Sequence, residues 1–166
     1  MAPSCTPPRP TFAPPQKTEH QEVPKEEWVS RTDARFYPIM ADGGGISQPD
    51  AALRSITVPQ LEMIVDHVKK MLKADGGWKV SRQNEQGKGI EVTITDVSQV
   101  NLYDLNEHLI KKATEGRQCS LAELICDEQQ PPDYFVSHWW GEPLVAFLAC
   151  LKRHSRDRFQ GGQIDG

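Results

Sequence analysis

The prolines of this 166-residue chain are concentrated near its amino-terminal end, and they limit where a folded domain can lie. Nine of the 13 prolines fall within residues 1–50, together with the run Gly43-Gly44-Gly45. Proline fixes φ and lacks the backbone N–H, so helix interiors and sheet ladders are not expected in such a stretch. Its apolar residues also show no helical or strand period, which leaves little surface to offset the ordering entropy. We therefore predict a disordered Pro-rich tail at 1–50, a folded domain at 51–160 and a disordered end at 161–166.

Two parts of this tail leave alternatives open. Pro7-Pro8-Arg9-Pro10 has the composition of a peptide that docks in an SH3-like groove, although we favour a solvated tail. Trp28, Phe36 and Tyr37 are the residues best suited to fold back onto the domain, because they are large aromatic side chains in an otherwise polar stretch.

Charge and composition exclude several classes of protein. The net charge is −4, whereas a general nucleic-acid binder shows a basic balance or a basic stripe. No run approaches the ~20 apolar residues that a membrane helix needs, and the first residues contain no apolar signal-peptide core. We therefore expect a soluble cytoplasmic protein without membrane association, for which nucleic acid is not the expected partner.

Capping residues and hydrophobic periodicity predict three helices before residue 130. Residues 57–60 contain a Thr/Gln capping box, and the apolar residues that follow have helical spacing: Leu61, Ile64, Val65, Val68 and Leu72. Asn101 can cap a second helix over about 102–114, and Gly116 can end it. A second capping box, Ser120-Leu121-Ala122-Glu123, opens a short third helix.

Two short runs between the first two helices predict a β-hairpin. Residues 90–95 alternate apolar and polar side chains and are rich in β-branched residues, and residues 78–82 form the shorter run. Gly87 and Gly89 in the polar connection allow positive φ angles.

The most distinctive segment is 133–143, Asp-Tyr-Phe-Val-Ser-His-Trp-Trp-Gly-Glu-Pro. Its continuous aromatic and β-branched run at 134–136 predicts a strand that is covered on both faces, as in a parallel sheet. Pro143 is placed to start a helix over 144–151. In open α/β sheets, ligands bind beyond the carboxyl end of a strand. The loop there is our candidate ligand or partner surface: Ser137, His138, Trp139, Trp140, Gly141 and Glu142.

Residues 133–151 resemble the F-V-S-H-x-W-G-E-P segment of an uncharacterised protein family that is expanded in dinoflagellate algae, and residues 100–105 and 119–124 look like that family too. More distantly, residues 135–142 resemble the first strand and loop of Toll/interleukin-receptor (TIR)-like domains, which often read F-L-S-F-R-G-E-D. The resemblance implies an α/β (or α+β) fold with one flavodoxin-like strand-loop-helix unit, preceded by helices and a small hairpin. Because only one such unit is present, it also implies that the domain is incomplete and that the chain is an N-terminal fragment.

The resemblance also implies a function. TIR-like domains assemble signalling complexes, so it implies an interaction or signalling module that is non-catalytic in this form, needs no cofactor, and meets a protein partner or a second copy through 137–142. Some such domains hydrolyse NAD with a Glu on a later helix, and one alternative is the N-terminal part of an NAD-hydrolysing or nucleotide-processing enzyme whose catalytic residues lie beyond residue 166. Another alternative is a structural scaffold that the Pro-rich tail tethers.

Some of these residues also permit a chemical interpretation. Ser137 and His138 suggest a nucleophile and a base, but adjacent strand residues point to opposite faces. The candidate zinc ligands are Cys119, Cys126, His138, Cys150 and His154. Their spacing matches no familiar zinc motif, so we favour buried structural thiols for the cysteines.

Three loop residues can each have one of two roles. Trp139 and Trp140 can stack on a base or sugar, or mark a partner surface, which we favour. Glu142 can bind a ribose hydroxyl, but we favour an ordinary first-turn residue that interacts with the helix dipole.

Overall fold

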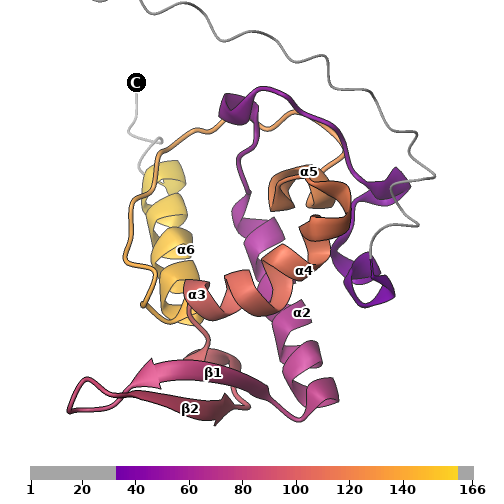
Figure 1. The fold of residues 1–166 in the computed structure, drawn as a ribbon. Coiled ribbons are helices and arrows are strands. Elements are labelled where there is room, and N and C mark those ends of the chain that lie inside the picture. The colour runs from indigo at the N-terminus through magenta and orange to yellow at the C-terminus, as the bar shows by residue number, and fades with distance from the viewer. Residues whose placement is uncertain (1–32, 161–166) are drawn as a thin grey trace, which may run out of the picture.

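The computed structural model describes residues 33–160, so the predictions for 1–32, which include Trp28, and for 161–166 lie outside the described residues. The described part combines helices with one two-stranded antiparallel sheet, which confirms the predicted mixture of helices and sheet. Figure 1 shows helix α2 in the middle of the molecule, helix α6 on one side and the hairpin below them. Of the helices in the described residues, none has both the length and the apolar character that crossing a bilayer requires.

Helix α2 (Val58–Asp75) forms as predicted and supplies the largest share of the core. The Thr57 hydroxyl accepts a hydrogen bond from the Gln60 backbone N–H, and the Gln60 side chain accepts one from the Thr57 backbone N–H. Together they form the predicted capping box. Gly76 ends the helix in the left-handed region at φ 70°. The face that packs inward is buried almost completely: Leu61, Ile64, Val65, Val68, Met71 and Leu72.

The predicted hairpin is formed by strands β1 (Trp78–Gln83) and β2 (Gly89–Ile94), which pair antiparallel with Trp78 opposite Ile94. Trp78 and Ile94 are buried under the helices, which anchors the base of the hairpin. Arg82 forms an ion pair with Asp104, a buried residue in the first turn of the next helix. Because charge-assisted bidentate pairs have a defined geometry, this contact orients the hairpin relative to that helix.

The predicted helix over 102–114 is present as one continuous rod of four stretches: α3 (Leu102–Leu105), the π-helical turn η5 (Asn106–Ile110), α4 (Lys111–Thr114) and the 3-10 turn η6 (Glu115–Arg117). Asn101 caps it, as predicted. The left-handed residue at its end is Gln118, at φ 52°, and not Gly116. The short helix α5 (Leu121–Ile125) follows with the predicted Ser120–Glu123 capping box.

Residues 33–50, which the sequence assigned to the disordered tail, pack on the folded part. They form the 3-10 turns η1 (Ala34–Ile39) and η2 (Asp42–Gly44), and with η3 (Ala51–Leu53) they make a segment, 33–55, that we call the strap. Phe36, one of the residues expected to fold back, is completely buried. The packed region therefore begins before residue 51, because apolar side chains without any period can still reach the core from short turns.

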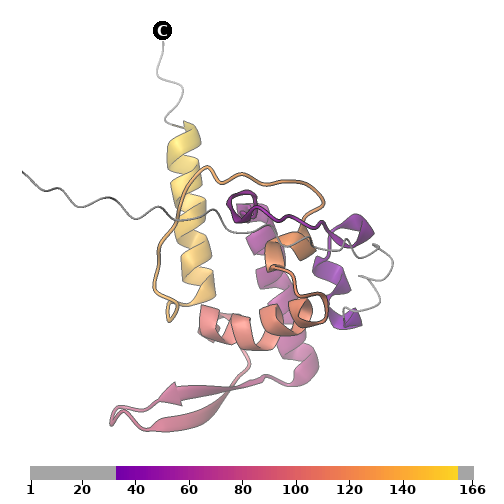
Figure 2. The same ribbon diagram turned by 45° about the horizontal axis from the view of Figure 1, so that its top comes forward.

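The strap is held to α5 and to the chain beyond it by backbone hydrogen bonds. The Ala41 N–H donates to the Leu124 carbonyl at 3.1 Å, and the Ile46 N–H donates to the Glu123 carbonyl at 2.9 Å. Further along, the Ser55 N–H donates to the Gln130 carbonyl at 3.0 Å. Figure 2 shows the first part of the strap beside α5, away from α6, and its last part crossing toward the start of α2.

The predicted strand at 134–136 is wrong. These residues lie in an irregular segment that runs from Cys126 to Pro143 and follows α6 (Leu144–Gln160) along its outer side, as Figure 1 shows. Within the described residues, no backbone hydrogen bond joins 131–138 to another segment. A strand needs a neighbouring backbone edge, and the only sheet of the described residues lies elsewhere, so strong β propensity is not enough.

The predicted helix at 144–151 is confirmed, and it continues through the basic run after Leu151 to Gln160. Leu144 and Leu148 face the core, and α6 packs against α2. Lysine and arginine favour a helix when packing on one face holds it in place, because their long side chains lose little freedom there.

The two glycines Gly45 and Gly76 allow a matched test of how the strap is held. Both have positive φ, but a Cβ on Gly45 would lie 2.1 Å from the Glu123 carbonyl oxygen, whereas a Cβ on Gly76 would meet nothing within 4 Å. We expect Gly76→Ala to lower the free energy of unfolding by about 1 kcal/mol, the left-handed penalty alone. Gly45→Ala should cost more than about 2 kcal/mol, because the strap must also move away from α5.

Urea unfolding of the two variants and the wild type checks this expectation. Equal losses for Gly45→Ala and Gly76→Ala would mean that the strap does not lie against α5 as described.

Candidate functional site

The loop that the sequence singled out, Ser137–Glu142, forms a corner that is held by backbone hydrogen bonds at its carboxyl end. The Leu102 N–H donates to the Trp140 carbonyl at 3.1 Å, and the Leu144 N–H donates to the Val100 carbonyl at 2.7 Å. The Glu142 N–H donates to the Trp139 carbonyl at 3.0 Å and closes the turn. The corner therefore joins the start of α6 to the start of α3, and its backbone is fixed without a parallel strand.

The side chains of this segment are unusually exposed for their type. Phe135 is 95% exposed and Trp139 is 73% exposed, and the other large apolar side chains nearby are about half exposed. We call the following set the aromatic strip: Tyr103, Tyr134, Phe135, Trp139 and Trp140. Tyr103 contacts Trp140, and the other members lie within seven consecutive residues of the chain, 134–140. Exposed apolar residues that gather in this way are a mark of an interaction surface, whereas singly scattered apolar residues are not.

The two ends of the strip rest on helix side chains. Trp140 lies edge-on to Tyr103 of α3, with ring centroids 5.5 Å apart and ring planes at 62°. Tyr134 lies edge-on to His154 of α6 at 5.0 Å, and the Arg158 guanidinium sits 5.8 Å from the Tyr134 ring centre. Tyr103 was not among the predicted site residues, because no local pattern shows that α3 meets a loop almost 40 residues later.

His138 is a packing residue of the corner. Its ring stacks on Phe147 of α6 at 3.8 Å with planes 16° apart, and its Nδ1 lies 3.1 Å from the Trp139 carbonyl oxygen. The same nitrogen is 3.8 Å from a Glu142 carboxylate oxygen. Ser137 is exposed, and within the described residues no hydrogen bond joins it to His138. A nucleophile and its base need such a contact, so this arrangement does not favour serine chemistry.

The candidate zinc ligands lie in separate environments. Cys126 is buried, and its thiol donates to the Glu128 carbonyl at 3.0 Å, whereas Cys150 is exposed on α6 and His154 lies against Tyr134. Burial raises the pKa of the Cys119 thiol, which disfavours the thiolate that binds metal. Within residues 33–160, no group of three or more His, Cys, Asp or Glu side chains is arranged to hold a metal ion.

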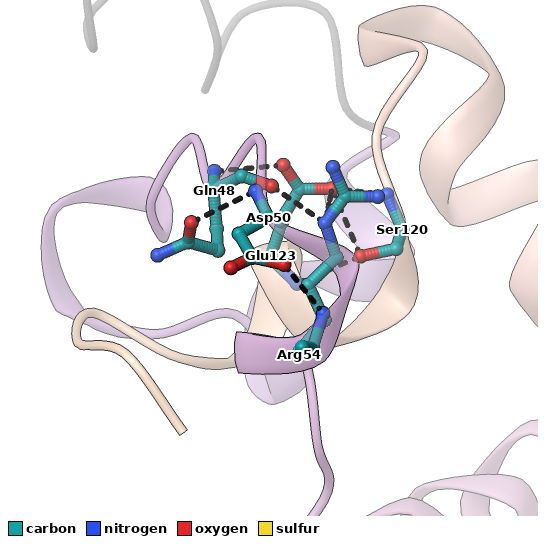
Figure 3. Close-up of polar contacts among 6 residues, drawn as sticks. Gln48, Asp50, Arg54, Ser120 and Glu123 are labelled. Carbon is teal, nitrogen blue, oxygen red and sulfur yellow. Dashed lines mark hydrogen bonds and ion pairs between the residues drawn. The ribbon is translucent and has the colours of Figure 1, made fainter. Parts of the chain in front are cut away.

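A second polar centre, which sequence reasoning did not single out, surrounds the Glu123 carboxylate (Figure 3). Glu123 is 7% exposed. Its two oxygens accept hydrogen bonds from the Ser120 backbone N–H at 2.8 Å, the Ser120 hydroxyl at 2.9 Å and the Gln48 backbone N–H at 2.9 Å. Arg54 Nε lies 3.7 Å from the same carboxylate. The Ser120–Glu123 capping box was visible in the sequence, but its contacts with the strap were not, because Gln48 is 75 residues away.

These contacts decide the charge of Glu123. Burial alone would raise the pKa of the carboxyl group, but the hydrogen bonds from Ser120 and Gln48 and the charge of Arg54 outweigh it and lower the pKa. The carboxylate is therefore ionised at neutral pH, with its oxygens already occupied by donors from within the chain. It holds the strap to α5 and is not suited to proton transfer at neutral pH.

Two recesses of the described surface are lined by residues outside the aromatic strip. One small cavity of about 10 Å³ lies beside Glu123, between Arg54, Cys126 and Gln130, and has room for about one water molecule. An open hollow near Lys111 and Cys119 lies at the carboxyl end of α4. No residue of the aromatic strip lines either of these two recesses.

No protein-family model, no curated protein and no solved structure matches the chain. The resemblances noted in the sequence therefore stay predictions.

Gly141 controls the position of Trp139. A Cβ on Gly141 would lie 2.2 Å from the Trp139 ring, so we expect Gly141→Ala to push the indole away from the corner. Because Trp139 is 73% exposed and the Cβ would meet its side chain and not the backbone, the free energy of unfolding should change by less than about 0.5 kcal/mol. The indole N–H signal of Trp139 in a ¹H–¹⁵N NMR spectrum should shift. In Gly89→Ala, where a Cβ meets nothing within 4 Å, it should not. An unchanged Trp139 signal in Gly141→Ala would contradict this placement.

The lowered pKa of Glu123 predicts a pH dependence of stability. The pKa of Glu123 is lower in the folded chain than in the unfolded chain, where it is about 4.3, so the ionised carboxylate stabilises the fold. This stabilisation is complete above the unfolded pKa and is lost as the pH falls through the folded pKa. Glu123→Gln replaces an acceptor by a donor facing the Ser120 amide, so we expect a loss of about 1–3 kcal/mol at pH 7. The difference from wild type should shrink as the pH falls below about 4.

Urea unfolding at pH 7 and pH 3.5 measures this difference. Glu107→Gln, which alters an exposed carboxylate paired with Lys111, is the matched control and should change stability by less than about 0.5 kcal/mol. A difference between wild type and Glu123→Gln that does not depend on pH would contradict the assignment.

Proposed function

We propose that this chain is a protein-interaction module, non-catalytic in this form, and that the aromatic strip is its docking surface. The proposal depends on one observation: Phe135 and Trp139 are 95% and 73% exposed on a corner whose backbone is hydrogen-bonded in place. Burying one such side chain against a partner is worth about 1.5–3 kcal/mol. Aromatic anchors on a rigid support are the residues that dominate binding energy in protein interfaces.

The rigidity of the corner supports this proposal, because ordering flexible side chains and loops on binding costs affinity. Trp140 is held at its backbone by Leu102, and its ring rests against Tyr103. A partner would therefore meet a preformed surface. The strip also has a mixed character, with Tyr hydroxyls and Trp indole N–H groups at the rims of apolar rings, which is typical of protein interfaces.

The likeness to TIR-like signalling domains does not carry this proposal. That likeness was based on a buried strand at 134–136, and the same residues are exposed and irregular. A signalling role and a cytoplasmic location are part of our proposal. The three described cysteines, which are free thiols, support the location because reducing compartments keep thiols unpaired. The NAD-hydrolysing alternative stays a prediction of the resemblance.

A comparison of variants in affinity capture tests the proposed surface. The full chain, a Phe135→Ser/Trp139→Ser double variant and an Ile90→Thr control would each be used to capture proteins from extracts of the cells that make it. Ile90 is 41% exposed and belongs to the hairpin, outside the strip. We expect wild type and Ile90→Thr to recover the same proteins and the double variant to recover them at least about tenfold less.

Sedimentation velocity of the same three proteins covers the case of a second copy as the partner, since the double variant should then dissociate. If the double variant recovers the same proteins and sediments as wild type does, the strip is not the docking surface. The scaffold alternative predicts that the tail alone is needed, and deletion of 2–32 tests it, because deletion of 1–50 would also remove Phe36 from the core.

A further inference from the structure

At one end of the strip, two partly exposed aromatic rings meet at an angle. Tyr103 is 55% exposed and Trp140 is 46% exposed, so part of each side chain is open to solvent. Their planes meet at 62° with centroids 5.5 Å apart, and we call this pair the Tyr103–Trp140 notch. Its rings project from two fixed backbones, the first turn of α3 and the corner before α6.

A notch of this kind suits a particular ligand chemistry. Domains that recognise proline-rich peptides present aromatic side chains between which a proline ring inserts, and the polyproline II conformation loses little entropy on binding. An amphipathic helix or a β-strand would require a long apolar groove or a free sheet edge instead. The sheet edges of the described residues belong to the two-stranded hairpin, which lies below α3 in Figure 1, and the two recesses described above are lined by other residues.

The chain itself contains a ligand of this chemistry. Pro7-Pro8-Arg9-Pro10 places two prolines, Pro7 and Pro10, three residues apart, which is one turn of polyproline II. Arg9 adds a positive charge between them. The turn that carries Trp140 also carries Glu142, whose side chain is 32% exposed, so a carboxylate lies in the same four-residue turn as the notch. Arginine and carboxylate pair with a defined, bidentate geometry, which would set the direction of the peptide.

The connection between the two segments is long enough. Residues 11–32 separate Pro10 from the strap, and these 22 residues span up to about 70 Å when extended. A folded part of the size of residues 33–160 has a radius of gyration of only about 14 Å. The tether also produces an effective concentration in the millimolar range, so that even a weak peptide site is occupied.

We propose that the Tyr103–Trp140 notch binds the Pro7–Pro10 segment of the same chain, with Arg9 paired to Glu142. The segment then covers one end of the aromatic strip and competes with any partner that uses it. This inference rests on the proposed function, since it names the kind of peptide that the strip recognises.

The test uses the full chain in two forms, wild type and a Pro7→Ala/Pro8→Ala/Pro10→Ala variant whose own segment is disabled. The probe is a synthetic peptide of residues 2–17 with Cys5→Ser, and the control peptide carries the same three alanines. The Trp140 indole N–H signal, assigned with Trp140→His, reports binding in ¹H–¹⁵N NMR titrations.

We expect the Trp140 indole signals of the two chains to differ, because only the wild type occupies its own notch. The added peptide should bind the triple-alanine chain at least about tenfold more tightly than it binds wild type. The control peptide should bind neither. Identical indole signals in the two chains, or equal binding of both peptides, would overturn the proposal. A wild-type signal that changes with protein concentration would place the segment of a second copy there and would overturn the intrachain form.

Substitutions in the notch separate its role from that of the rest of the strip. Tyr103→Ala in the triple-alanine chain should weaken peptide binding by about tenfold or more, whereas Phe135→Ser should change it by less than about twofold. Loss of binding in Phe135→Ser with no effect of Tyr103→Ala would contradict the notch assignment.

A charge reversal gives a test that does not depend on removing a ring. Glu142→Lys in the triple-alanine chain should lower the affinity for the wild-type peptide. A peptide with Arg9→Glu should bind this Glu142→Lys chain with at least half of the lost affinity restored. Failure of this recovery would overturn the Arg9–Glu142 pairing. If no peptide binds but Phe135→Ser/Trp139→Ser still loses its captured partners, the inference fails and the proposed docking surface stands.

Discussion

Two backbone hydrogen bonds hold the aromatic corner of the molecule, residues 137–142, in place. The Leu144 N–H reaches the Val100 carbonyl at 2.7 Å, and the Leu102 N–H reaches the Trp140 carbonyl at 3.1 Å. They satisfy amides at the first turns of α3 and α6, which have no partner within their own helices. Because one pair of contacts serves both helix starts, the position of α6, the direction of the loop before it and the exposure of Trp139 and Trp140 all depend on it.

On the other side of the molecule, the buried Glu123 carboxylate holds the strap against α5. Glu123 accepts hydrogen bonds from the end of the strap and from its own helix cap, and a carboxylate that is buried in this way is stable only while those donors stay in place. Gly45 allows the strap to approach the Glu123 carbonyl closely enough for the adjacent Ile46 amide to bond to it. The strap thus covers α5 through polar contacts, and Phe36 and Ile39 add apolar contacts to the core.

Of the large apolar side chains that the described surface exposes, the strip holds the two most exposed, Phe135 and Trp139. The buried core of the described residues is formed by the helices, the hairpin and the strap, and it includes none of the five strip residues. The five aromatic side chains of the strip therefore stabilise the described fold less than side chains of the same size would if they were buried. This exposure is the reason why we propose the strip as a docking surface.

Much of the local structure was predictable. The capping boxes at Thr57 and Ser120 marked helix starts that the structure confirms, and the alternation over 90–95 predicted the second strand of the hairpin. The candidate site was predictable in part: the corner 137–142 was identified, but Tyr103 was not, and its partner strand at 134–136 does not exist. Glu123 was recognised as a cap and not as the residue that binds the strap.

The sequence by itself determined the helix starts, the hairpin and the position of the aromatic corner, because caps, turns and periodicity act over three or four residues. Only the tertiary structure decided that residues 33–50 join the core, that Tyr134–Val136 lie exposed beside α6, and that Tyr103 meets Trp140. The physical reason is that a strand, a buried carboxylate and an aromatic pair each need a partner from a distant part of the chain, and no local pattern specifies which part arrives.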